Sequence, residues 1–216
     1  MKILIITSGT IGSGKSSLTS LLAKELKTEA FYESVDNNPV LPLFYSDPQQ
    51  YAFLLQIFFL NTRFASIKKA LKHDNNVLDR SIYEDSLFFH MNAEMGRATE
   101  TEVEVYDKLL ASMLEEIQLA APKKAPDLLI HIEVSLETML HRIKKRGRDY
   151  EQLSYDESLY DYYQELNKRY AQWYEDYNHS PKMKIDGDRY DFMENLEDRK
   201  IVLGLIKEKL AELGRL

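Results

Sequence analysis

The chain has 216 residues, of which 44% are hydrophobic and 29% charged, and its formal net charge is -7. A chain of this length is expected to form one domain, and its acidic balance argues against a general nucleic-acid binder. It has no cysteine, which excludes disulfides, thiolate zinc sites and a cysteine nucleophile. We find no signal-peptide pattern and no run of about 20 apolar residues, so we expect a cytoplasmic protein with no nucleic-acid or membrane partner.

Short apolar runs alternate with longer helical patterns along the chain. The runs predict five strands, at residues 3–6, 30–32, 77–78, 127–134 and 183–185. Apolar residues three and four apart predict helices at residues 18–26, 51–71, 102–120, 155–177 and 196–213. Strands that alternate with helices predict an α/β fold with a five-stranded parallel sheet flanked by helices, because parallel strands need crossover connections.

The first apolar run leads into GTIGSGKS, residues 9–16, which fits the phosphate-binding pattern G-x-x-x-x-G-K-[ST] in full. Glycines let backbone N–H groups converge on phosphate oxygens. Lys15 would reach the β and γ phosphates, and the Ser16 hydroxyl would ligate Mg²⁺. A turn that merely caps a helix is the alternative, but a full match in the right place is rare. We expect ATP contacts from Gly9, Thr10, Ile11, Gly12, Ser13, Gly14, Lys15, Ser16 and Ser17.

The loop alone does not say what receives the phosphate. A regulatory GTPase would need a D-x-x-G element, yet no aspartate is followed three positions later by glycine. The only N-K pair, NKRY at Asn167, lacks the aspartate of the base-reading N-K-x-D motif. The sequence therefore favours a small-molecule kinase.

Acidic residues follow the second and third predicted strands, where open α/β folds bind ligands. Glu33 comes after the second strand, and Asp79 with Arg80 comes at the end of the third. A carboxylate there can accept the proton of an attacking hydroxyl, and an aspartate can orient Mg²⁺. A solvated loop glutamate and a helix N-cap by Asp79 or Ser81 are the structural alternatives.

Five of the seven residues from Arg142 to Arg148 are basic. Cations complement the C-terminal end of a helix dipole, but five exceed that need in an acidic chain. A triphosphate carries about four negative charges, and a closing arginine lid would neutralise them.

The segments FYESVDNNP, LDRSIYEDSLFF and HRIKKRGRDYEQ follow the phosphate loop in this order. Together they resemble the deoxynucleoside kinases, specifically the bacterial deoxyadenosine/deoxyguanosine kinase branch, over essentially the whole chain. The resemblance implies a P-loop kinase fold as a single domain over residues 1–216, with an arginine-rich lid at about residues 142–151. It implies catalysis by Glu33 as general base with Arg80 and Lys15, Mg²⁺ at Ser16 and Asp79, and ATP contacts from Arg142, Arg146 and Arg148.

The resemblance also implies where an acceptor binds. Gln56 and Arg63, seven residues apart on one helix face, would read the base, Arg63 together with Asp85. Without the resemblance, an Arg63–Asp85 salt bridge and a core glutamine bonded to backbone would be the better explanation. Tyr45 and Glu151 match contacts to the 3′-hydroxyl, so the implied acceptor set is Glu33, Tyr45, Gln56, Arg63, Arg80, Asp85 and Glu151. The segment KIDGDRYDF resembles an adenine loop, which adds Asp188 and Tyr190 to the ATP contacts.

The implied reaction is ATP- and Mg²⁺-dependent phosphorylation of the 5′-hydroxyl of a purine deoxynucleoside, deoxyguanosine slightly ahead of deoxyadenosine, with deoxycytidine left open. Two alternatives remain: a nucleoside monophosphate kinase of the thymidylate kinase type, and a nucleotide-sensing subunit without turnover. The resemblance further implies a dNTP as feedback inhibitor, and a homodimer or a heterodimer with a related subunit. Asp79 stands where many relatives have Glu, which bears on the substrate rather than the reaction.

Overall fold

The computed structural model describes residues 3–33, 38–70, 76–120 and 126–215. Residues 34–37 of the FYESVDNNP motif and Leu71, the expected end of a long helix, lie outside the described residues. Among the helices that are described, none is long and apolar enough to cross a membrane.

One sheet organises the molecule, and all of its strand pairs are parallel. Its strands are β1 (Leu4–Gly9), β2 (Glu29–Phe31), β3 (Asn76–Asp79), β4 (Leu128–Glu133) and β5 (Lys182–Asp186). They lie in the order β2-β3-β1-β4-β5, so the predicted five-stranded parallel sheet is confirmed. The sheet is covered on both faces, which explains why its inner strands β1, β3 and β4 are buried along nearly their whole length.

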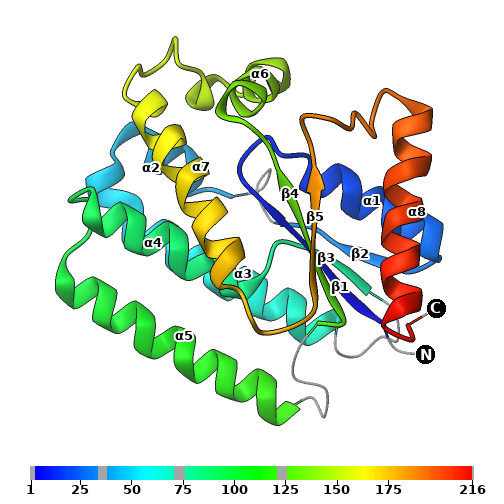
Figure 1. Ribbon diagram of the computed structural model, residues 1–216. Helices are drawn as coiled ribbons and strands as arrows, with labels where there is room; N and C mark the ends of the chain where they lie inside the picture. Colours follow the sequence, from blue (N-terminus) through cyan, green and yellow to red (C-terminus); the bar gives the residue numbers. More distant parts are fainter. Residues whose placement is uncertain (1–2, 34–37, 71–75, 121–125, 216) are drawn as a thin grey trace.

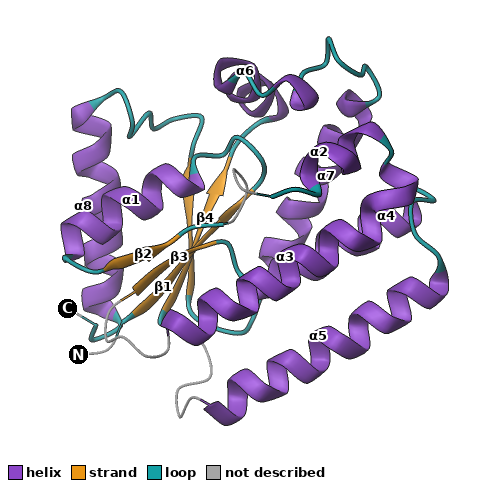
Figure 2. Cartoon of the chain, turned by 180° about the vertical axis from the view of Figure 1, so that it is seen from behind, coloured by secondary structure: helices purple, strands orange, loops and turns teal. Residues whose placement is uncertain are grey.

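Helices pack on both sides of the sheet (Figures 1 and 2). One side carries α1 (Lys15–Leu26) and α8 (Leu196–Glu212), and the other carries α3 (Pro48–Ala70), α4 (Asp85–Glu94) and α7 (Leu159–Asp176). Successive residues of β1 point to opposite sides: Ile5 packs in a cluster with Leu22 and Ile206, and Ile6 in a cluster with Leu60 and Tyr106. Helix α5 (Glu100–Ala120) contacts α3 and α4 and lies outermost.

The remaining helical segments follow strands β2, β3 and β4 along the chain. They are α2 (Leu41–Ser46), α6 (Leu136–Arg146) and the 3-10 turns η1 (Ile82–Glu84) and η2 (Asp149–Glu151). Helix α2 was not predicted, because six residues that include Pro42 are too few to show helical periodicity. The helix expected from residue 155 starts only at Leu159, because turns occupy the residues just before it.

The strand register brings three connections to one edge of the sheet. Thr7 of β1 lies opposite Asp79 of β3, and Phe31 of β2 lies opposite Leu78. The segments that follow β1, β2 and β3 therefore emerge side by side at their carboxyl ends, the usual ligand-binding edge of an open α/β sheet.

Candidate active site

The glycine-rich loop joins β1 to α1. Its glycines Gly9 and Gly14 have φ of 143° and 101°, values that L residues rarely adopt. A Cβ on Gly9 would lie 2.6 Å from the carbonyl oxygen of Ile132, so no larger residue fits. The loop ends at the first residue of α1, Lys15, and the positive end of that helix therefore adjoins it.

Lys15 is folded back onto this loop. Its Nζ donates a hydrogen bond of 2.7 Å to the carbonyl oxygen of Thr10, and the residue is buried. Burial, and after it the charge of Arg80, lowers the pKa of Lys15 to about 8. A bound phosphate oxygen would replace the Thr10 carbonyl as the acceptor.

Ser16 and Asp79 are joined across the loop. The Ser16 hydroxyl donates to Asp79 Oδ2, and burial raises the pKa of this carboxyl. Among the described residues no three His, Cys, Asp or Glu side chains gather into a metal site. A hydroxyl and one carboxylate nevertheless fit Mg²⁺, which takes oxygen ligands from one or two carboxylates, water and phosphate.

Glu33, which follows β2, lies between two arginines. Its Oε1 is 2.9 Å from Arg63 Nη2 and 3.0 Å from Arg80 Nε. Burial alone would raise the pKa of Glu33, but the charges of Arg80 and Arg63 outweigh burial and lower this pKa to about 2. The carboxylate is therefore ionised at any physiological pH.

Arg80 occupies the residue directly after β3. Its backbone N–H donates to Thr7 O at 2.9 Å, which fixes it to β1, and its φ is 74°. Non-glycine residues adopt this left-handed conformation only at a cost, and such strain is concentrated at functional sites. The guanidinium lies 4.6 Å from the ring centre of Phe88.

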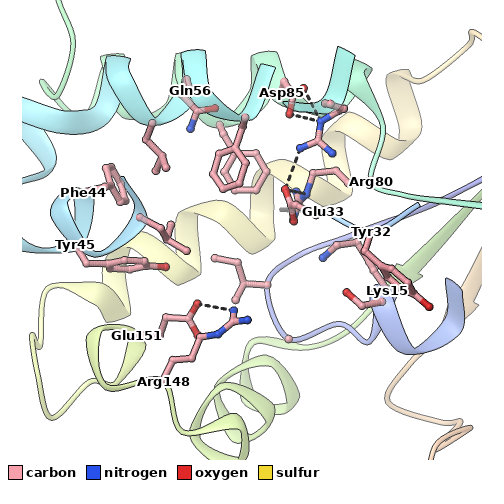
Figure 3. A pocket seen from close by; sticks show the side chains of 18 of the residues that line it. Lys15, Tyr32, Glu33, Phe44, Tyr45, Gln56, Arg80, Asp85, Arg148 and Glu151 are labelled. Atoms are coloured by element: carbon pink, nitrogen blue, oxygen red, sulfur yellow. Dashed lines mark hydrogen bonds and ion pairs between the residues drawn. The ribbon is translucent and has the colours of Figure 1, made fainter. Parts of the chain in front are cut away.

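A first cavity, of about 230 Å³, opens beside these residues and the glycine loop. Figure 3 shows Gln56, Glu33, Tyr45, Glu151 and Lys15 around it. The structure thus brings together the whole acceptor set implied by the sequence, since its walls include Glu33, Tyr45, Gln56, Arg63, Arg80, Asp85 and Glu151.

Arg63 links Asp85 to Glu33 in the wall of the first cavity. Its Nε lies 2.9 Å and 2.7 Å from the two carboxylate oxygens of Asp85, while its Nη2 holds Glu33. Burial raises the pKa of Asp85, and the charge of Arg63 opposes that shift. The salt bridge considered as a structural alternative is present, and it also forms part of the cavity wall.

Aromatic side chains supply the apolar part of the first cavity. Phe44, Phe59, Phe88, Tyr32 and Tyr162 line it. Phe44 of α2 lies in the wall, whereas Phe53 of α3 and Phe89 of α4 pack in the core. Phe88 could have been found, because it lies three residues after Asp85 and hence on the same helix face.

Tyr45 and Glu151 form the far wall. The Tyr45 ring packs on Tyr150 at 5.1 Å between centroids. Glu151 pairs with Arg146 and, at 3.4 Å, with Arg148, and its carbonyl oxygen accepts a 2.9 Å hydrogen bond from the Tyr163 hydroxyl.

A second cavity, of about 450 Å³, lies on the other side of the glycine loop. It shares Gly12, Lys15, Ser16, Arg146 and Arg148 with the first, so the two cavities meet at the loop. Helix α6 ends at Arg146 and is capped by Gly147, which has φ of 73°, so Arg148 lies beyond the helix.

Arg142 has a different environment from the other two arginines. It donates to Ser13 O at 2.9 Å and to Gly187 O at 2.8 Å. It therefore links the glycine loop to the turn that follows β5, and it still lines the second cavity.

The two side chains expected at an adenine contact lie away from both cavities. Asp188 accepts hydrogen bonds from the backbone N–H and hydroxyl of Ser135, and it lines a separate cavity with Thr10 and His131. Tyr190 packs against the core with Arg189 over its ring at 5.0 Å. Phe192 lines the second cavity instead, and its ring carbon comes within 3.1 Å of a Cβ built on Gly14.

Known proteins that are similar to this chain include nucleoside kinases, which agrees with a site that has a phosphate-binding loop beside a cavity. A family model described as deoxynucleoside kinase matches residues 5–211. The chain is 65% identical over 212 residues to a deoxyguanosine kinase of Lactobacillus acidophilus, covering 98% of this chain and 92% of that protein. It is 57% identical over 212 residues to a deoxyadenosine kinase of the same organism, covering 98% of both. Its fold is similar to that of a deoxyadenosine kinase from M. mycoides with bound dATP, with a TM-score of 0.78 and 27% identity over 95% of this chain and 100% of that one.

Proposed function

The chain belongs to the deoxynucleoside kinase family, and we propose that it phosphorylates the 5′-hydroxyl of purine deoxynucleosides with ATP. One observation carries the proposal. Glu33, an ionised carboxylate, lines one cavity together with Lys15 of the loop where a triphosphate would end, and with Gln56 and aromatic side chains that suit a nucleoside. Because the more similar of the two Lactobacillus relatives is a deoxyguanosine kinase, we place deoxyguanosine ahead of deoxyadenosine.

The base and the sugar would occupy opposite ends of the first cavity. Gln56, a buried amide, would pair with the base edge, and the Arg63–Asp85 pair would form the second reader. Tyr45 and Glu151 would contact the 3′-hydroxyl. The mixed apolar and polar lining of this cavity suits a small neutral ligand of this kind.

Phosphoryl transfer would take place between Glu33 and the glycine loop. The 5′-oxygen attacks the γ-phosphorus as the bond to the ADP oxygen breaks, and Glu33 accepts the hydroxyl proton. A pKa of about 2 makes Glu33 a weak base while both arginines hold it. A phosphate bound beside Arg80 would offset the largest charge that lowers this pKa, without a movement of the guanidinium, and so would strengthen Glu33 as a base.

The phosphates would be held by backbone N–H groups of the loop, by Lys15 and by the arginines at and beyond the end of α6. We propose residues 142–151 as a lid in which Arg146 and Arg148 exchange Glu151 for phosphate oxygens, while Arg142 keeps the lid tied to the loop. Mg²⁺ would be held by Ser16 and Asp79, where it would neutralise charge on the β and γ phosphates. Asp188 and Tyr190 would serve the donor adenine through the backbone of their turn.

We also propose a dimer, formed with an identical or a related subunit, through the outer helices. Leu54 of α3 and Val105 of α5 are about half exposed, which leaves apolar surface on that side of the molecule. A dNTP would inhibit by placing its nucleoside in the first cavity and its phosphates at the loop.

Transfer from γ-³²P-labelled ATP to a panel of acceptors tests the proposal. We expect product with deoxyguanosine and deoxyadenosine, little with thymidine, and none with dTMP, because its phosphate would meet the Glu33 carboxylate. Turnover of dTMP but not of nucleosides would instead identify a monophosphate kinase. Tight dNTP binding with no turnover of any acceptor would identify a sensing subunit.

A further inference from the structure

Two residues contact Arg80 on the side away from the first cavity. Neither was predicted as a site residue, and neither has a role in the proposed mechanism. Glu84 is fully buried and Tyr170 is 1% exposed, and the first cavity is lined by Arg80 but by neither of them. The Tyr170 hydroxyl donates to Glu84 Oε2 at 2.8 Å and accepts a hydrogen bond from Arg80 Nη1. Arg80 Nη1 also lies 3.6 Å from Glu84 Oε2, so the three groups form a closed, buried network.

Local structure fixes Glu84 in this network. Its Oε1 accepts from the backbone N–H of Ser81 at 2.8 Å, and the Ser81 hydroxyl caps the same turn by accepting from Tyr83 N at 3.0 Å. This capping box leaves Oε2 for Tyr170. Trp173 Nε1 donates to Tyr83 O at 3.1 Å, which ties α7, the helix that carries Tyr170, to the turn that carries Glu84.

A contribution to fold stability alone does not explain the buried network of Arg80, Glu84 and Tyr170 well. Buried ion pairs add little stability, and apolar residues of the same volume often replace them without loss. Burial raises the pKa of Glu84 and the charge of Arg80 lowers it, so the carboxylate depends on the arginine as its counter-charge. The network therefore serves the orientation of the guanidinium better than the stability of the fold.

The contacts of Arg80 define the plane of its guanidinium. Nε lies 3.0 Å from Glu33 but has no aligned hydrogen bond, and Nη1 is bound to Tyr170. The Phe88 ring packs against the guanidinium at 4.6 Å. The Nε edge is thus free to donate elsewhere, while the Nη1 edge is held on the side away from the cavity.

We propose that Glu84 and Tyr170 are positioning residues, which hold the Arg80 guanidinium between Glu33 and the glycine loop so that it meets the transferring phosphate without reorienting. The proposal rests on the proposed function and deepens it, since Arg80 is the group that acts. Neither Glu84 nor Tyr170 touches a substrate in this arrangement. Loss of either should therefore lower kcat and leave substrate affinity nearly unchanged.

Tyr170→Phe is the first test, with Tyr174→Phe as its matched control. Tyr170→Phe keeps the ring that packs on His131 and Phe88 and loses only the hydroxyl. Tyr174 lies one turn further along α7, and its ring stacks on the same histidine at 5.0 Å. We expect Tyr170→Phe to lower kcat roughly tenfold with each KM within about twofold, and Tyr174→Phe to have no such effect.

Two further variants separate positioning from stability. Glu84→Gln keeps the contact with Ser81 and removes the charge, and we expect a loss of kcat of the same kind. In an Arg80→Ala background, Tyr170→Phe should cause no additional loss, because the group through which it acts is gone. An unchanged kcat in Tyr170→Phe, or an equal additional loss in the Arg80→Ala background, would overturn the proposal.

Nuclear magnetic resonance of ¹⁵N-arginine-labelled protein gives a readout that needs no turnover. The Arg80 side-chain signals, assigned by comparison with Arg80→Lys, should show slow rotation of the guanidinium in the wild type and fast rotation in Tyr170→Phe and Glu84→Gln. Unaltered Arg80 signals in both variants would contradict the positioning role. A wild type that phosphorylates no purine deoxynucleoside would sink the proposed function alone, since these spectra would still decide the orientation of Arg80.

Discussion

The two cavities that meet at the glycine loop are built in opposite ways. In the first cavity the cations that contact Glu33 are almost completely buried and already paired: the side chains of Arg63 and Arg80 are 5% exposed. Arg146 and Arg148 belong to both cavities. In the second cavity the side chains of Arg146 and Lys145 are 33% and 62% exposed, and Lys145 pairs with a surface glutamate, Glu194.

The contrast separates two tasks. Buried, paired charges keep one geometry, because an unpaired partner in a low-dielectric site is very costly. Exposed cations pair weakly and are screened by salt, so they can exchange partners when a polyanion arrives. We infer that base reading and proton transfer are organised before substrates bind, whereas the grip on the phosphates is completed during binding.

The largest effect should come from Glu33, the proposed proton acceptor in the first cavity. Glu33→Gln keeps the shape and removes the negative charge, so kcat for deoxyguanosine should fall by roughly 10²–10⁴-fold. Glu29→Gln, at the start of the same strand β2, is the control and should retain wild-type kcat. Undiminished phosphoryl transfer in Glu33→Gln would show that Glu33 is not the general base, and would contradict the proposal that the acceptor binds in the first cavity.

Asp85→Asn probes the buried pairing itself. Arg63 would lose the carboxylate that holds its Nε, so KM for deoxyguanosine should rise roughly 10–100-fold, and the free energy of unfolding should fall by about 3 kcal/mol. Asp107→Asn is the exposed counterpart, because Asp107 pairs with His90 and their side chains are 47% and 39% exposed. Urea denaturation should show a change below about 1 kcal/mol there. Equal changes in the two variants would erase the contrast between buried and exposed pairs.

Arg148→Ala tests the exposed side of the comparison. Removing one partly exposed cation beside the loop should raise KM for ATP roughly tenfold at low ionic strength, and less at high salt. Lys144→Ala is the control, since Lys144 is exposed on α6 and does not line either cavity at the loop. A loss that is independent of salt would mean that Arg148 acts as a buried group.

The smallest effect concerns pH and Lys15, which belongs to both cavities. With a pKa of about 8, Lys15 loses its charge as the pH rises, so kcat/KM for ATP should fall about fourfold between pH 7 and 8.5. The profile of kcat should be flatter, because bound phosphate favours the charged form.

Stability should move in the opposite direction. The pKa of Lys15 is lower in the folded chain, at about 8, than its ordinary 10.5. Between these values the unfolded chain binds more protons, so this group makes the folded state more stable as the pH rises. Unfolding linked to Lys15 therefore does not explain a fall in kcat/KM, and a kcat/KM that is flat up to pH 9 would contradict the lowered pKa.

The sequence predicted the parts of the site that depend on spacing and strand ends. The glycine pattern gave the loop, and the strand ends placed Glu33, Asp79 and Arg80 at one edge, because parallel register aligns those ends. Helical periodicity placed Gln56 and Arg63 on one helix face, since seven residues are close to two turns, and the resemblance to deoxynucleoside kinases assigned both to the acceptor.

Contacts between distant segments could not be predicted from spacing. Tyr170 lies 90 positions from Arg80 in the chain, and its aromatic neighbours make it look like an ordinary core residue. The position of Asp188 depends on Ser135 at the start of α6, and Arg142 is bound to carbonyls from two other segments. In each case the packing of α6 or α7 on the sheet determines which residue the side chain contacts, and a local sequence pattern does not contain that information.

Arg63 joins the residue that would test the base to the residue that would take the proton, through a single guanidinium. This link matters for a redesign of the cavity to accept an unnatural nucleobase, because Arg63 contacts both Asp85 and Glu33. A substitution chosen to retune selectivity at Asp85 or Arg63 also alters the basicity of Glu33, so turnover would shift along with preference. Redesigned variants should therefore be compared by turnover and by base preference together. Lost turnover should be restored by changes at Glu33 and its neighbours, and not only at the residues that contact the base edge.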